Sequence, residues 1–211
     1  MNKDWEVFLT TGIGKAKFGI SQKEFDAFSE TYGKVFRSIS FDDKEQTAEE
    51  FRDFLEEFDL DDLLLDEEIE SAVKQSNEIN LRFKGVIDER RLKEFIIAVE
   101  YNNGVFYSAT TDGHNDQVHH EGLRIFSTDA KKLLQHFQNL NGGAKVHETD
   151  VLFDKIGILL TGHYYQNEQG SWRFYREGDS IFEDRFVTVF DPLYIGRYLT
   201  DGFVEVDFRQ K

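Results

Sequence analysis

The sequence predicts an α+β fold with a largely antiparallel sheet, about three to four helices and a more helical N-terminal half. Helical apolar periodicity occurs mainly before residue 80, and short alternating segments follow it. Helices at the front of a chain followed by runs of strands are typical of the α+β class. The 211 residues contain no low-complexity linker. They therefore predict one domain over residues 1–211, with a candidate subdivision near residues 76–80.

The N-terminal segment predicts a strand, a glycine turn and a helix. Apolar residues alternate over residues 5–9, and the glycines of TTGIGKAKFG (10–19) are typical of a turn between two short strands. Ser21 and Glu24 match the S-x-x-E capping box, so we expect a helix to begin there. Gly33 is placed to end that helix.

The next segment combines helical periodicity with concentrated negative charge. A second capping box, Thr47 to Glu50, opens it. Residues 42–70 contain 15 acidic residues and two basic ones, a local net charge of −13 in a chain whose net charge is −16. An apolar stripe, interrupted near residues 59–62, predicts an amphipathic helix or a pair of helices. The stripe comprises Phe51, Phe54, Leu55, Phe58, Leu63, Leu64, Ile69 and Val73.

Beyond residue 80 the periodicity changes from helical to alternating. The segments 81–88, 91–101 and 104–111 predict three strands, and Asn103-Gly104 is a sequence favoured in two-residue hairpin turns. A third helix is expected after Ser127 or Thr128. The remaining chain predicts strands in VLFDKIGILLTGHYY, SWRFYREG, IFEDRFVTVF and FVEVDF.

Composition excludes several classes of function. A net charge of −16 argues against binding to nucleic acid or to an anionic membrane, because both partners require a basic surface. The absence of cysteine excludes disulfides and thiolate chemistry and fits a reducing compartment. MNKDWEVFLTTG lacks the apolar run of a signal peptide, so we expect a cytoplasmic protein.

The loop DGHNDQVHHEG places His114, His119 and His120 close together in the sequence. It does not match a calcium loop, because Gln117 stands where glycine is required. His120-Glu121 lacks the second histidine of a zincin motif. A polar connecting loop is therefore the main interpretation, and the alternative is a metal-dependent hydrolase using residues 112–121. No other catalytic pattern is complete, so we expect no catalytic residues and no cofactor.

The acidic segment supports two interpretations. Charge runs on helices are usually solvated faces. However, like charges at i, i+4 repel, and a concentrated anionic face is well suited to a strongly basic partner. The predicted contact residues are Glu49, Glu50, Asp53, Glu56, Glu57, Asp61, Asp62, Glu67 and Glu68.

Two stretches of the sequence carry a recognisable pattern, Phe18, Gly19, Ile20, Ser21 and Glu24 in the first, and Phe153, Ile156, Gly157 and Ile158 in the second. Together they resemble small bacterial immunity proteins of polymorphic or contact-dependent toxin systems. The resemblance implies that the protein binds and neutralises a cognate toxin of the same cell. The resemblance also accounts for the acidity of the chain, since many such toxins are basic nucleases. It implies no catalytic residues in this sequence. An acidic adaptor with a partner other than a toxin is the remaining alternative.

Overall fold

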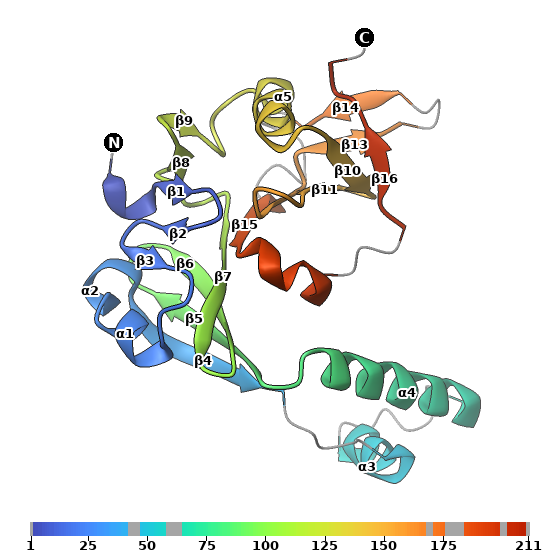
Figure 1. The fold of residues 1–211 in the computed structure, drawn as a ribbon. Helices are drawn as coiled ribbons and strands as arrows, with labels where there is room; N and C mark the ends of the chain where they lie inside the picture. Colours follow the sequence, from blue (N-terminus) through green and yellow to red (C-terminus); the bar gives the residue numbers. More distant parts are fainter. Residues whose placement is uncertain are drawn as a thin grey trace.

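The computed structural model describes residues 2–41, 47–57, 65–167, 171–175, 184–198 and 202–209. A nine-stranded sheet forms its centre, in the order β16-β10-β11-β12-β15-β7-β6-β5-β4 (Figure 1). Every strand pairing in this sheet is antiparallel, which confirms an α+β fold with a largely antiparallel sheet. The strands are β4 (Lys34–Ser40), β5 (Val86–Leu92), β6 (Ile96–Asn102), β7 (Val105–Asp112), β10 (Ala144–His147), β11 (Asp150–Phe153), β12 (Ile158–Thr161), β15 (Phe186–Phe190) and β16 (Val204–Val206).

Smaller sheets and the helices surround this centre. The short strands are β1 (Val7–Phe8), β2 (Gly12–Ile13), β3 (Ala16–Lys17), β8 (His119–His120), β9 (Leu123–Arg124), β13 (Tyr164–Gln166) and β14 (Trp172–Phe174). The helices are α1 (Gln22–Asp26), α2 (Ser29–Tyr32), α3 (Ala48–Glu57), α4 (Asp66–Arg82) and α5 (Ala130–Asn141), with 3-10 turns η1 (Lys3–Trp5) and η4 (Pro192–Arg197). The described residues thus contain five α-helices, more than the three to four expected. The helical segment after Ser21 is divided into α1 and α2, and the acidic segment is divided into α3 and α4.

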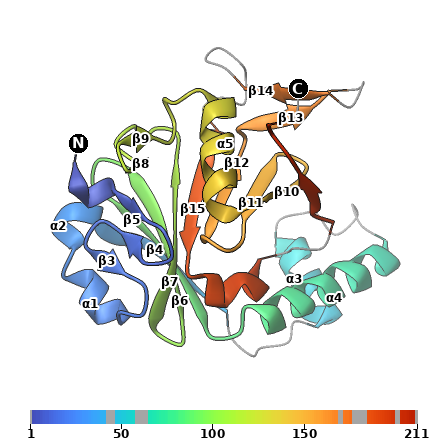
Figure 2. The ribbon, with the colours of Figure 1, turned by 45° about the horizontal axis from the view of Figure 1, so that its top comes forward.

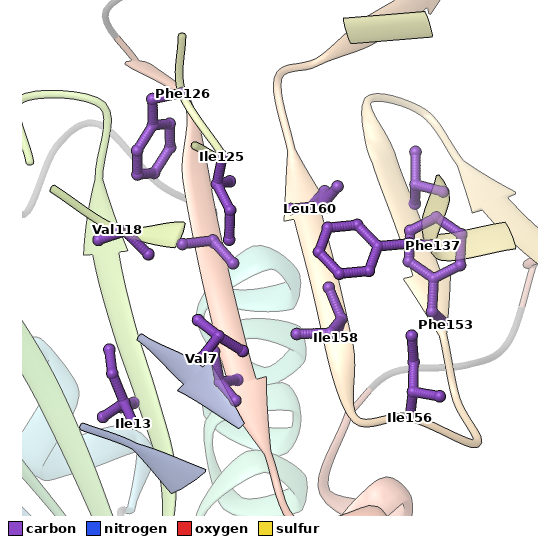
Figure 3. Packing of buried hydrophobic residues seen from close by; sticks show 14 of the residues in the cluster. Val7, Ile13, Val118, Ile125, Phe126, Phe137, Phe153, Ile156, Ile158 and Leu160 are labelled. Atoms are coloured by element: carbon purple, nitrogen blue, oxygen red, sulfur yellow. The ribbon is translucent and has the colours of Figure 1, made fainter. Parts of the chain in front are cut away.

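One face of the large sheet carries the main core. Strand side chains alternate between faces, so every second residue of β6, β7, β15, β12 and β11 points to the same side. The N-terminal elements β1–β3, α1 and α2 cover one half of this face, and α5 covers the other half (Figure 2). Figure 3 shows Phe137 of α5 beside Phe153 and Leu160 of the sheet. Two segments far apart in the sequence therefore share one apolar core.

The local signals at the N-terminal helix are confirmed. Ser21 accepts a hydrogen bond from the Glu24 amide, and the Glu24 carboxylate accepts one from the Ser21 amide. Gly33 follows α2 with φ of +86°, and a Cβ there would lie 2.2 Å from the carbonyl carbon of Leu92. Only glycine meets both requirements.

The predicted hairpin turn is also confirmed. Asn103 and Gly104 both have positive φ, as a type I′ hairpin turn between β6 and β7 requires.

Several predicted boundaries are wrong. Trp5 belongs to η1, so the first strand starts at Val7. Helix α4 continues to Arg82, and the strand predicted from residue 81 starts at Val86. The N-cap of α5 is Asp129, whose carboxylate accepts a hydrogen bond from the Lys132 amide. At α5, Asp129 rather than Ser127 or Thr128 satisfies a free backbone amide of the first turn.

A buried ion group joins α1 to the sheet. The side chain of Arg91 is 1% exposed and that of its partner Glu89 is 5% exposed. The Arg91 guanidinium also pairs with Asp26 of α1 and lies 5.0 Å from the centre of the Phe25 ring. Gln22 donates a further hydrogen bond to Glu89. Because each buried charge has a partner, the group positions α1 without leaving an unpaired charge.

We expect Arg91→Ala to lower the free energy of unfolding by about 3–5 kcal/mol, because Glu89 would stay buried without its partner. Urea unfolding followed by circular dichroism measures this change. Arg124→Ala is the matched control, because the Arg124 side chain is 51% exposed, and its effect should stay within about 0.5 kcal/mol. The double variant Arg91→Met with Glu89→Leu should recover much of the loss, and equal effects of Arg91→Ala and Arg124→Ala would contradict the assigned role.

Candidate interaction surface

Helices α3 and α4 form a unit that we call the acidic arm. Its own small core contains Leu55, Ile69 and Val73, with Ala48 and Phe51 packed against them. This cluster is separate from the main core, and the arm lies beside the sheet where β4 ends and β5 begins (Figure 1). The sequence predicts an amphipathic helix or a pair of helices, and the structure has a pair. The predicted interruption at residues 59–62 lies outside the described residues.

Capping interactions define where the two helices of the arm begin. Thr47 and Glu50 form the predicted capping box, with the Thr47 amide 3.1 Å from the Glu50 carboxylate. At the start of α4, the Glu68 carboxylate accepts a hydrogen bond of 2.8 Å from the Leu65 amide. Carboxylates at helix N-termini also interact favourably with the helix dipole. Two of the predicted contact residues, Glu50 and Glu68, therefore also stabilise their own helices.

The structure places five of the predicted contact residues on the surface of the arm. Glu49, Glu50 and Asp53 are exposed on α3, and Glu67 and Glu68 are exposed in the first turn of α4. Glu56 and Glu57 belong to α3, although their side chains are outside the described part, and Asp61 and Asp62 are outside the described residues. Three further exposed acids of α4 were not among the predicted contact residues: Asp66, Glu70 and Glu78. The charged run 42–70 contains Asp66 and Glu70, so the sequence could have identified these two residues as part of the acidic surface.

Few basic residues neutralise the arm internally. Helices α3 and α4 contain ten acidic residues and three basic ones, a net charge of −7. Arg52 lies 2.8 Å from Asp66 and joins the two helices, but both side chains are well exposed, so the pair contributes little stability. Arg82 donates hydrogen bonds to the carbonyls of Gly196 and Tyr198 and so anchors the end of α4 to η4.

The histidine loop connects β7 to the N-terminal sheet. His114 is exposed beside Asp112, with 3.3 Å between Nδ1 and the carboxylate. His119 and His120 are buried neighbours on β8, so their side chains point to opposite sides. The His120 Nδ1 lies 2.9 Å from the Val7 carbonyl, and the His119 Nδ1 lies 2.9 Å from the Gln117 carbonyl. The His120 side chain thus links the loop to β1 at the Val7 carbonyl, whereas the His119 contact lies within the loop.

These histidines do not converge on a common point. Within the part of the chain that the structure describes, no three His, Cys, Asp or Glu side chains are grouped as metal ligands. Residues 112–121 all belong to that part. The geometry therefore gives no support to a metal-dependent hydrolase that uses His114, His119 and His120.

His163 is a fully buried histidine next to β12. Its Nδ1 lies 3.0 Å from the Thr161 carbonyl, and its ring stacks on Phe126. Burial and the nearby positive charge of Arg185 lower the pKa of His163 to about 3. The imidazole is therefore neutral at physiological pH, and its surroundings are those of a core residue.

Comparisons with protein families, with curated proteins and with solved structures found no match. None of the helices in the described residues is both long enough and apolar enough to cross a membrane.

We expect His163 to make the protein less stable in acid. Its pKa in the folded state is below its ordinary value of 6.5, so the unfolded chain binds the proton first. Its contribution to the free energy of unfolding is thus complete above pH 6.5 and declines by up to about 1.4 kcal/mol per pH unit toward pH 3. Chemical unfolding of the wild type and His163→Leu between pH 8 and pH 4 tests this. The variant should be less stable at pH 8 and should lose less stability on acidification, and identical pH dependence would contradict the expectation.

Proposed function

We propose that this protein is a non-enzymatic immunity protein that binds a basic protein toxin through the acidic arm and neutralises it in the cytoplasm of the producing cell. The observation that carries the proposal is the segregation of charge. The arm forms a small unit of its own with a net charge of −7. Its exposed carboxylates are held on two helices with capped N-termini, so they form an ordered surface.

The arm's charge distribution is unfavourable for the isolated protein. Glu49 and Asp53 are four residues apart on α3 and both are exposed. Like charges at this spacing destabilise a helix by roughly 0.2–0.5 kcal/mol per pair. A basic partner removes this repulsion and gains complementary electrostatic contacts. The same field also accelerates association with a cation-rich surface.

The proposed mechanism is occlusion. A toxin that acts on nucleic acid needs a basic cleft to bind phosphate. Helices α3 and α4, presenting Glu49, Asp53 and Glu67, would occupy such a cleft with carboxylates in place of phosphates. Neutralisation then requires tight binding only, which agrees with the absence of a completed catalytic pattern in the sequence.

The test is a binding and growth assay with the protein encoded next to its gene. The triple variant Glu49→Lys, Asp53→Lys and Glu67→Lys reverses three exposed charges while keeping both caps, Glu50 and Glu68. We expect it to bind at least a hundredfold more weakly than the wild type and to leave cells unprotected, because each lost contact becomes a repulsion. Isothermal titration calorimetry and co-expression measure the two effects.

The matched control reverses three exposed acids outside the arm, Glu30→Lys, Glu94→Lys and Glu148→Lys. It changes net charge by the same amount and should keep nearly wild-type affinity. Equal losses in both triple variants would show that only net charge matters and would remove the arm from the proposal. An arm that binds a basic protein without toxic activity would support the adaptor function instead.

A further inference from the structure

The second face of the large sheet carries exposed apolar side chains at one end, beside polar residues such as Thr110 and Thr188. An antiparallel sheet with one face in water alternates apolar and polar residues. In β6, Ile97 and Val99 point into the main core, whereas Ile96 and Ala98 point to the opposite face. Strand β15 carries Phe186 on that opposite face as well. Exposed apolar side chains that lie close together on a surface are typical of an interaction site.

Only part of this second face is covered by the described residues of the chain. Segment η4 lies over one end, where Tyr194 contacts Tyr107 with 4.8 Å between ring centres, and Tyr198 contacts Phe190 at 4.3 Å. Tyr107 and Phe190 are fully buried there. Toward the other end of the strands, Leu92 is 49% exposed and Ile96 and Phe186 are each 40% exposed.

The strand register brings these exposed side chains together. Leu92 lies directly opposite Ile96 on the neighbouring strand, and Phe186 lies opposite Asp112 on β7. In the adjacent row, Arg37 lies opposite Arg90, and Arg90 lies opposite Ala98. We call this surface the open sheet patch; it comprises Lys34, Arg37, Arg90, Leu92, Ile96 and Phe186.

The side of the open sheet patch next to β4 is basic although the chain has a net charge of −16, whereas Asp112 of β7 lies opposite Phe186 on the other side of the patch. Lys34 and Arg37 are exposed on the edge strand β4. Arg90 is half exposed, and its guanidinium lies 3.7 Å from Asp88, too far for a strong pair. An occupant of this patch must therefore supply carboxylates together with apolar side chains.

The acidic arm has this chemistry. Besides its exposed carboxylates, α4 and its N-cap carry three exposed apolar residues: Leu65 at 73%, Ile79 at 50% and Leu81 at 74%. The arm is attached too far away to cover the open sheet patch of the same copy. It joins the sheet after β4 and before Val86, whereas Leu92 lies at the far end of β5, roughly 20 Å away. Arg82 also holds the end of α4 at η4.

We propose that two copies of the chain form a symmetric dimer in which the acidic arm of each copy lies on the open sheet patch of the other. A two-fold axis makes both contacts at once, because each copy contributes one arm and one patch. The dimer covers the second face of the sheet and pairs the basic residues of the patch with carboxylates. This inference does not rest on the proposed function, because it requires no toxin.

Sedimentation equilibrium of the full chain tests the dimer. We expect the wild type to dimerise, and we expect a rise in salt from about 0.05 M to 0.5 M to weaken the dimer at least tenfold, since the contacts are largely electrostatic. A wild type that stays monomeric at low salt up to about 0.1 mM would overturn the proposal.

A charge exchange locates the contact. One variant reverses the patch (Lys34→Glu, Arg37→Glu and Arg90→Glu), and the other reverses the arm (Glu49→Lys, Asp53→Lys and Glu67→Lys). Each variant alone should be monomeric because arm and patch then repel, and an equimolar mixture should form a heterodimer in which both contacts are attractive again. Circular dichroism confirms that both variants fold. Dimers of either variant alone, or a mixture that stays monomeric, would overturn the proposal.

Discussion

The side chains of a β-strand alternate between two faces. The burial of one face of the central strands of the nine-stranded sheet is the constraint on which the rest of the structure depends. Neither the N-terminal elements nor α5 alone covers that face, and both contribute to one core. The Arg91 ion group, with Glu89 and Asp26, positions α1 on it. His120 joins β8 to β1 through the Val7 carbonyl. These buried polar contacts decide where the covering elements lie, because hydrophobic burial by itself has no direction.

The acidic arm follows from the same constraint. The core face is already covered by other elements, and α3 and α4 pack mainly against each other around Leu55, Ile69 and Val73. With such a small core, the arm keeps many of its side chains in water. Water solvates carboxylates at little cost, so their high density is tolerated there and would not be tolerated in the main core. Arg82 then links the arm to the sheet at η4.

Charge segregation connects the two proposed contacts. Negative charge gathers on the arm, and the basic residues of the open sheet patch remain at the β4 edge of the sheet. A molecule with separated charges of opposite sign attracts basic partners at one surface and acidic partners at the other. Both proposals therefore share one arm, and a toxin that binds it would compete with the second copy. Competition of this kind would make toxin binding and dimer dissociation two aspects of one equilibrium.

The sequence by itself determined the features that depend on neighbouring residues: the capping boxes at Ser21 and Thr47, the Asn103-Gly104 hairpin, the amphipathic helix pair and the local excess of carboxylates. A cap or a turn involves residues within about four positions, so its signal is contained in a short segment. Only the tertiary structure decided that the histidines of residues 112–121 diverge, that Arg91 is buried, and that the described residues leave the patch beside β4 exposed. These properties depend on strands that meet from distant parts of the chain, and alternation within one strand does not specify which neighbour covers each face.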